Sequence, residues 1–169
     1  MLHLVTGGTS NGKSAIAEAL CRQYRGDGPM WYIATMRVWD SEGLAKVAEH
    51  RRRRRGMGFR TIERYTDAGG LKVSGACLLE CLSNLLANEM FDRDRCGREA
   101  EDKILADILA LRDRTHSLVI VTNDIFEDGA AYSPSTLDYL QALGRLNTRI
   151  AALADRVTEA VAGIALTVK

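Results

Sequence analysis

The chain has 169 residues, of which 46% are hydrophobic and 27% are charged, and its formal net charge is +1. This length and apolar content predict one domain, residues 1–169, with a buried core, and they exclude an intrinsically disordered chain. A net charge near zero supplies no global field that would attract nucleic acid or a membrane surface.

A glycine-rich segment follows the first apolar run, Leu2 to Thr6. It reads Gly7-Gly8-Thr9-Ser10-Asn11-Gly12-Lys13-Ser14 and matches the phosphate-binding loop pattern G-x-x-x-x-G-K-[ST] in full. The glycines let backbone N–H groups surround a polyphosphate at the start of the next helix, whose dipole favours anions. Lys13 is expected to reach the β- and γ-phosphates, and Ser14 to ligate Mg²⁺. The alternative is an ordinary glycine-rich turn from strand to helix.

Helix and strand patterns alternate after this loop. Apolar residues recur at helical spacing from Ser14 to Tyr24, and the turn residues of the segment Arg25 to Pro29 end that helix. The run Met30 to Thr35 is rich in aromatic and β-branched residues, which predicts a buried strand. A strand, helix, strand order predicts a parallel βαβ unit and therefore an α/β fold.

The next helix is predicted from about Ser41 to Arg54, with Asp40 or Ser41 as its N-cap. Its end carries His50 followed by five consecutive arginines, Arg51 to Arg55. The arginines fit three interpretations: a solvated helix end whose cations complement the dipole, a nucleic-acid patch, or guanidinium groups that bind phosphate. The run alone does not decide among them.

An acidic residue ends the third strand-like run. Arg60 to Glu63 is a short extended candidate, and Ala76 to Leu82 predicts a buried strand. Glu80 lies near the carboxyl end of that strand, where open parallel sheets gather ligand-binding groups. Glu80 is therefore the candidate for the second acid of the Mg²⁺ shell, and the alternative is that it caps the following helix. Ser117 to Asn123 predicts a fourth strand of the same kind.

The remaining segments complete the order of elements. Helices are predicted over three of them: Ser83 to Met90, Asp102 to Arg114 and Thr136 to Asp155. Phe91 to Glu101 is predicted to be a polar loop, and Asp124 to Pro134 has the turn composition of a substrate loop. Val157 to Val161 and Ile164 to Val168 predict an antiparallel hairpin at the edge of the sheet.

The other cysteines and histidines are assigned no chemistry. Cys21, Cys77, Cys81 and Cys96 form no C-x-x-C pair, so reduced and mostly buried thiols are expected. His3 and His116 are expected to be structural or to face solvent. The chain begins directly in a strand-like run, and no apolar run reaches the ~18 residues of a membrane span, so we expect a cytoplasmic protein.

Several separated stretches together resemble one family, the bifunctional adenosylcobinamide kinases and adenosylcobinamide-phosphate guanylyltransferases of cobalamin biosynthesis. The matching motifs cover nearly the whole chain: Leu4 to Ser14, Tyr32 to Thr35, Asp40 and Glu42 with Lys46, Val47, His50 and Arg51, Thr61 and Glu63, Leu78 to Cys81, Val119 to Asp124, and Gly144 to Lys169. The resemblance implies a single-domain RecA-like P-loop NTPase fold, with a mostly parallel sheet flanked by helices and a C-terminal β-hairpin. It also implies a homotrimer.

The resemblance implies roles for particular residues. His50 is expected to attack the α-phosphate of GTP and to carry GMP as guanylyl-histidine before adenosylcobinamide phosphate accepts it. The other activity phosphorylates adenosylcobinamide with GTP or ATP. Glu63 and the backbone at Ala34 and Thr35 match guanine contacts of the family. A cluster of cations beside the histidine can stabilise charge on the phosphate oxygens: Arg51, Arg52, Arg53 and Arg54.

The chain departs from the family pattern at three places. Thr9-Ser10-Asn11 stands where an Arg-Ser pair is usual, Phe59 stands where tryptophan is frequent, and the segment after Asn123 lacks the usual V-G-x-G-I-V-P. Two alternatives remain beside the bifunctional enzyme. One keeps the fold with a single activity, and the other is a nucleotide-dependent regulatory or nucleic-acid-binding module that uses Arg51 to Arg55. The low net charge and the lack of aromatic residues interleaved with basic ones count against the last.

Overall fold

A computed structural model describes residues 1–38, 41–93, 95–124 and 132–169, and gives only the backbone of residues 41, 42, 46 and 53. The predicted N-cap Asp40 and residues 125–131 of the predicted turn segment 124–134 lie outside these residues, as do the side chains of Glu42, Lys46 and Arg53.

In the described part of the chain, seven strands form one sheet in the order β3-β2-β4-β5-β1-β6-β7. The strands are β1 (Leu2–Thr6), β2 (Met30–Ala34), β3 (Phe59–Glu63), β4 (Ala76–Glu80), β5 (Ser117–Val121), β6 (Arg156–Val161) and β7 (Ile164–Thr167). Strands β1 to β6 run parallel, and β7 pairs antiparallel with β6 at one edge. The mostly parallel sheet and the C-terminal hairpin that the sequence predicts are confirmed.

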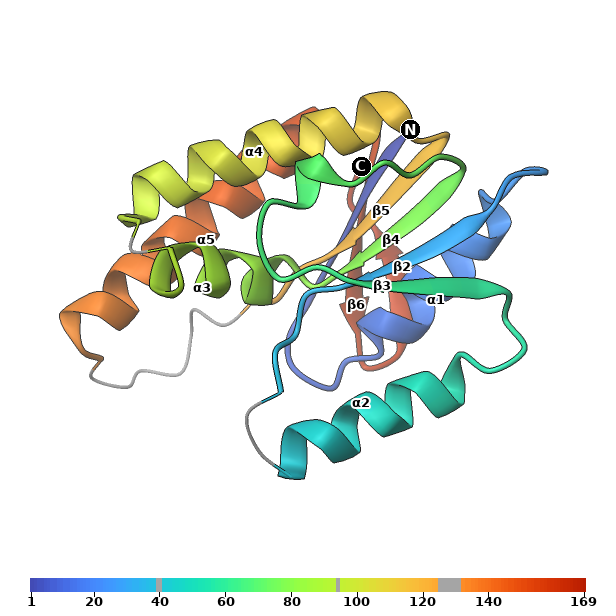
Figure 1. Cartoon of the computed structure of the whole chain (residues 1–169), viewed down its shortest axis with the longest axis horizontal. Coiled ribbons are helices and arrows are strands. Elements are labelled where there is room, and N and C mark those ends of the chain that lie inside the picture. The colour runs from blue at the N-terminus through green and yellow to red at the C-terminus, as the bar shows by residue number, and fades with distance from the viewer. Residues whose placement is uncertain (39–40, 94, 125–131) are drawn as a thin grey trace.

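Helices cover both faces of the sheet. They are α1 (Lys13–Gln23), α2 (Ser41–Arg53), α3 (Leu82–Phe91), α4 (Gly97–Arg114), α5 (Pro134–Leu153) and the short 3₁₀ turn η1 (Ala68–Gly70). Figure 1 shows α3, α4 and α5 together on one side of the sheet, with α1 and α2 on the other. Within the part of the chain that the structure describes, none of these helices has the length and hydropathy required to cross a membrane.

Two apolar cores follow from the strand sequences. In β1, the side chains of Leu2 and Leu4 pack into the core under α3, α4 and α5, whereas Val5 packs into the core under α1. Successive residues of a strand point to opposite faces, so a strand that is apolar throughout must be covered twice. The sheet is therefore buried on both faces, and polar side chains of the central strands gather at the strand ends.

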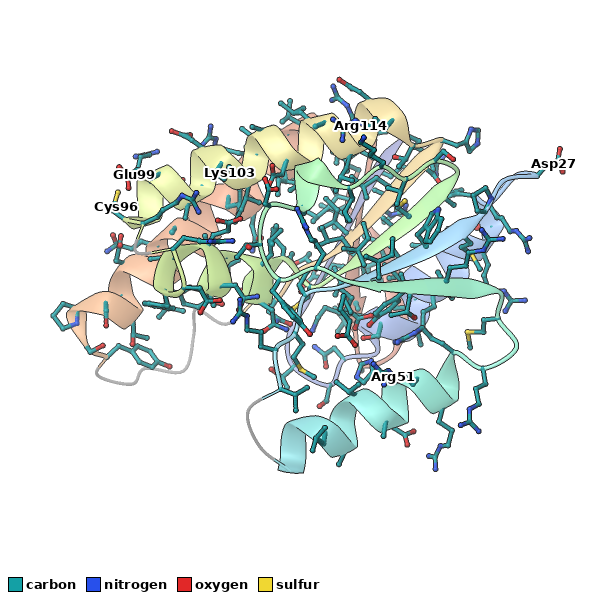
Figure 2. The ribbon with its side chains drawn as sticks, viewed as in Figure 1. Asp27, Arg51, Cys96, Glu99, Lys103 and Arg114 are labelled. Atoms are coloured by element: carbon teal, nitrogen blue, oxygen red, sulfur yellow. The ribbon has the colours of Figure 1, made fainter. Side chains whose placement is uncertain are left out.

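The predicted loop from Phe91 to Glu101 is wrong over its second half, because α4 already begins at Gly97. The amide of Cys96 donates to the Glu99 carboxylate at 3.3 Å, and both residues lie at the start of α4 in Figure 2. Glu101 is buried and accepts from Arg145 of α5 at 2.5 and 2.8 Å. The charged residues that favoured a loop are thus part of the α4–α5 packing.

Only part of the apolar surface of α5 is buried. Leu143, Leu146 and Ile150 are fully buried, whereas Leu137 and Leu153 are 44% and 41% exposed. At about 100° per residue, Leu143, Leu146, Ile150 and Leu153 lie near one side of the helix, whereas Leu137 lies on the opposite side. Leu153 is on the buried side but is the last residue of the helix, where it stays partly exposed.

Two substitutions on α5 test this assignment. We expect Ile150→Ala to lower the free energy of unfolding by about 2–5 kcal/mol, because the truncation leaves a cavity in a packed core. Leu153→Ala shortens a side chain that is already 41% exposed, so we expect a smaller loss, of about 1 kcal/mol. Urea unfolding of the two variants measures both values, and equal losses would contradict the boundary of the core.

Candidate functional site

The loop between β1 and α1 is supported by the C-terminal hairpin. The amide of Gly163, at the hairpin turn, donates to the carbonyl of Asn11 at 3.2 Å. Gly7 has a positive φ of 142°, and a Cβ at this position would lie 2.5 Å from the carbonyl oxygen of Ala160 in β6. The close approach of β6 therefore requires glycine at the start of the loop.

Lys13 and Ser14 are the loop residues whose side chains are expected to bind phosphate and metal. Lys13 is buried, and its Nζ donates to the carbonyl of Gly8 within the loop. Burial lowers the pKa of Lys13 below its ordinary value, and the charge of Glu80 is among the influences that oppose this shift. The Ser14 hydroxyl donates to Oε1 of Glu80. Thr9 and Ser10 lie exposed at the tip of the same loop.

The carboxylate of Glu80 joins three elements at the end of β4. Its Oε1 accepts from Ser14, its Oε2 accepts from the hydroxyl of Tyr32 at 2.8 Å, and Nδ1 of His50 lies 4.0 Å from Oε1. The alternative role as a cap of α3 is not adopted, because Cys81 is the N-cap of that helix. The predicted metal carboxylate thus lies beside the predicted metal hydroxyl and near the predicted nucleophile.

Tyr32 is a site residue that the sequence analysis gave no role. Its side chain is buried on the α1 side of β2, and the guanidinium carbon of Arg54 lies 3.4 Å from its ring centroid. Burial and the neighbouring Glu80 raise the pKa of Tyr32 well above its ordinary value, although Arg54 opposes this. The hydroxyl therefore remains a donor to the carboxylate. A tyrosine in an apolar, buried strand was the available signal, since a buried hydroxyl needs a partner.

A cavity of about 340 Å³ lies between α2 and the ends of β2, β3 and β4. Six of the predicted site residues line it: Ala34, His50, Arg51, Arg54, Glu63 and Glu80. The rest of the lining is mostly apolar, which is typical of small-molecule sites of this size. The cavity therefore brings the histidine, two of the arginines and both acids to one place.

The arginine run divides between solvent and cavity. Arg51 donates to Glu63 at 2.6 Å, and Figure 2 shows it on the side of α2 that faces the sheet. Arg52 pairs with Glu49 on the helix surface, and its side chain is 72% exposed. Arg54 alone among the described side chains of the run is buried. The interpretation of a solvated helix end thus fits Arg52, whereas Arg54 turns inward.

Thr35 lies beneath the cavity and does not line it. Its side chain is fully buried, and its amide donates to the carbonyl of Glu80 at 3.1 Å. Its hydroxyl accepts from the amide of Cys81 at 2.7 Å and donates to the carbonyl of the same residue at 2.8 Å. The hydroxyl of Thr35 therefore ties β2 to the end of β4, and the guanine contact expected at its backbone stays a prediction. Ala34 lines the cavity, and the guanine contact expected at its backbone also stays a prediction.

The two other histidines and the four cysteines occupy the expected environments. His3 is buried between the hydroxyls of Tyr24, at 3.1 Å, and Thr158, at 2.8 Å, and His116 is exposed. All four cysteines are free thiols, and only Cys96 is exposed.

The residues at the loop fit a Mg²⁺ ion bound together with phosphates. Among the described residues, no group of three or more His, Cys, Asp and Glu side chains could hold a metal by itself. The hydroxyl of Ser14 beside the carboxylate of Glu80 is nevertheless the pair of hard oxygen donors that Mg²⁺ takes when a nucleotide supplies the other ligands. The donor chemistry is therefore compatible with the predicted ion.

Comparison with known proteins identifies a family with this arrangement. The family model described as cobinamide kinase / cobinamide phosphate guanyltransferase, CobU, matches residues 3–168. The bifunctional adenosylcobalamin biosynthesis protein CobU of Salmonella typhimurium is 33% identical over 186 aligned residues, which cover 100% of both chains. The bifunctional adenosylcobalamin biosynthesis protein CobP of Pseudomonas aeruginosa is 30% identical over 174 residues, which cover 100% of this chain and 98% of that protein.

A solved structure agrees with the fold. The flagellar accessory protein FlaH from Methanocaldococcus jannaschii superposes with a TM-score of 0.51 at 12% sequence identity, over 99% of this chain and 77% of that protein. At this identity the likeness concerns the fold alone, and it agrees with the RecA-like P-loop arrangement that the sequence predicts.

The structural role of Thr35 generates a prediction. We expect Thr35→Val to lower the free energy of unfolding by about 1–3 kcal/mol, because the buried amide of Cys81 loses its hydrogen-bond acceptor. Thr35→Ser keeps the hydroxyl and is expected to recover most of this loss. Chemical denaturation of both variants measures the difference, and a Thr35→Val protein as stable as wild type would contradict the assignment.

Proposed function

The chain belongs to the CobU family of cobinamide kinases / cobinamide phosphate guanyltransferases, and we propose that it performs both reactions in one nucleotide-binding domain, residues 1–169. In the first reaction it phosphorylates adenosylcobinamide with a nucleoside triphosphate, GTP or ATP. In the second it transfers GMP from GTP to adenosylcobinamide phosphate through a guanylyl-histidine at His50.

One observation carries the proposal. The side chains of Ser14, in the phosphate loop, and His50, on α2, both approach Oε1 of Glu80. A triphosphate held by the loop therefore lies near an imidazole that can act as a nucleophile. This proximity links the motif for binding phosphates to a residue capable of accepting a nucleotidyl group.

The guanylyl step follows from these positions. A ring nitrogen of His50 attacks the α-phosphorus, a nitrogen–phosphorus bond forms, and pyrophosphate leaves with the electron pair of the broken phosphorus–oxygen bond. A phosphate oxygen of adenosylcobinamide phosphate then attacks the same phosphorus, and the electron pair of the broken nitrogen–phosphorus bond returns to the ring. Lys13 and the loop amides hold the β- and γ-phosphates meanwhile.

We propose that the lining of the cavity binds the guanine base and balances the charge of the phosphates. Glu63 can accept from N1–H and N2–H of guanine, which favours GTP over ATP, and Ala34 lies in the same lining. Glu63 accepts from Arg51 and from Tyr65 in this structure, so the base replaces or joins these contacts. Arg51 and Arg54, the arginines of the run that line the cavity, supply the positive charge near the phosphates.

The kinase step uses the loop. Lys13 binds the phosphates that flank the transferred group, and Ser14 and Glu80 are the residues that would hold Mg²⁺. When bound, that ion neutralises charge on the β- and γ-phosphates. The chain's own contribution is to hold the nucleotide in the loop while the corrinoid hydroxyl approaches.

Two further properties belong to the proposal. We expect a homotrimer, as the resemblance to the family implies. We also assign the reactions to the cytoplasm, because four free thiols, among them the exposed Cys96, suit a reducing compartment.

Incubation with α-labelled GTP and Mg²⁺, followed by denaturation, tests the nucleophile. We expect label on the wild-type chain that is lost in acid and retained in alkali, as for a phosphoramidate. His50→Ala is expected to carry no label, and Lys13→Ala much less than wild type. His116→Ala is the matched control, because it removes an exposed histidine outside the cavity, and it is expected to be labelled like wild type. Label retained by His50→Ala would remove the proposed nucleophile.

The same preparation separates the bifunctional enzyme from a protein with one activity. Adenosylcobinamide is supplied together with γ-labelled ATP or GTP. Labelled adenosylcobinamide phosphate supports the kinase half of the proposal, and its absence from a chain that still takes the guanylyl label would leave only the transferase.

A further inference from the structure

One arginine of the run differs from its neighbours in environment. Arg54 is 7% exposed, whereas the side chains of Arg51 and Arg52 are 58% and 72% exposed and each pairs with a glutamate. A buried charge is costly unless hydrogen bonds and an opposite charge compensate it. Arg54 therefore calls for an explanation that the other arginines do not.

The contacts of Arg54 leave two of its three guanidinium nitrogens without a protein partner in the described part of the chain. Its plane stacks on the ring of Tyr32, with 3.4 Å between the guanidinium carbon and the ring centroid. Its Nε and Nη1 are buried and have no hydrogen-bond acceptor among the residues that the structure describes. The side chain also lines the cavity, so a ligand bound there can supply an acceptor to the guanidinium.

Arg54 is placed beside the nucleophile by the helix. It follows His50 by four residues, and its amide donates to the carbonyl of His50 at 3.1 Å. Residues four apart on a helix lie on the same side, and both side chains line the same cavity. A phosphate bonded to the imidazole of His50 therefore lies near the guanidinium of Arg54.

We propose that Arg54 is a catalytic residue of guanylyl transfer, whose guanidinium donates to a non-bridging oxygen of the α-phosphate while that group passes from pyrophosphate to His50. Tyr32 is the positioning residue that holds the guanidinium plane. The inference rests on the function proposed above. In the step itself the nitrogen–phosphorus bond to His50 forms and the bond to the pyrophosphate oxygen breaks, and Arg54 exchanges no proton because it stays charged throughout.

Geometry favours the α-phosphate over the other phosphates of the reaction. The β- and γ-phosphates belong to the loop around Lys13, whereas Arg54 shares one side of α2 with the group that attacks the α-phosphorus. A guanidinium held in a fixed plane gives a charge-assisted hydrogen bond to a phosphate oxygen, and such donors act most strongly where water is excluded. The stacked and buried Arg54 meets both conditions.

Single-turnover labelling by α-labelled GTP tests the role of Arg54. We expect Arg54→Met to slow the formation of guanylyl-His50 by roughly 10²- to 10³-fold, the loss seen when one preorganised donor to a transition-state oxyanion is removed. The dissociation constant of GTP is expected to change far less than the rate, because the contact strengthens in the transition state. Arg54→Lys is expected to recover only part of the rate, because an ammonium lacks the planar fork. Arg55→Gln, an exposed neighbour, is the matched control and is expected to keep the wild-type rate.

Thermal unfolding separates catalysis from structure. Because Arg54→Met removes a buried charge with two unpaired donors, we expect its melting temperature to be no lower than that of wild type. A large fall in melting temperature together with the loss of labelling, with no recovery of either in Arg54→Lys, would instead indicate a structural residue and overturn the proposal.

Two other outcomes also overturn the proposal. Labelling of Arg54→Met at the wild-type rate would show that Arg54 has no catalytic role in guanylyl transfer. Arg54→Met that is labelled normally but passes GMP slowly to adenosylcobinamide phosphate shows that the guanidinium binds the phosphate of the acceptor. In both cases the labelled wild type leaves the proposed function standing, whereas wild type that takes no label contradicts that function and the role of Arg54 with it.

Discussion

The carboxylate of Glu80 is the contact on which the arrangement of the site depends. It accepts hydrogen bonds from Ser14 of the phosphate loop and from Tyr32 of β2, and it lies 4.0 Å from Nδ1 of His50 on α2. A carboxylate that is only 11% exposed needs such hydrogen-bond partners to offset the cost of its burial. Because its partners come from three different elements, satisfying one carboxylate also fixes the loop, the strand end and the helix relative to one another.

Support from the far end of the chain keeps the loop in this position. Strand β6 approaches Gly7 so closely that a side chain there would meet its backbone, and the hairpin turn at Gly163 bonds to Asn11. Residues near both ends of the chain therefore shape the same phosphate site. On the other side of the site, α2 contributes His50 and Arg54 to the cavity lining, so the fold encloses the space where a triphosphate and a nucleophile meet.

The features that could be predicted from the sequence are those that depend on neighbouring residues. The loop motif, the strands and the position of Glu80 at a strand end all follow from local patterns, and the structure agrees with them. The start of α4 was missed because Glu101 is buried by pairing with Arg145, which is distant in sequence. The separate environments of Arg52 and Arg54 were equally inaccessible, since a run of identical residues carries no apolar pattern that would show which side chain turns inward. Tyr32 was overlooked because its partners, Glu80 and Arg54, come from other elements.

In the proposed mechanism, the phosphate loop and α2 act on the same nucleotide. A crystal structure with Mg²⁺ and the α,β-methylene analogue of GTP tests this proposal directly, because the carbon bridge between its α- and β-phosphates is not cleaved. We predict the triphosphate in the loop from Gly7 to Ser14, with a ring nitrogen of His50 about 3–3.5 Å from the α-phosphorus, the separation of a near-attack geometry. A triphosphate seated in the loop with the ring of His50 turned away from it and Glu80 no longer near the imidazole would contradict the account.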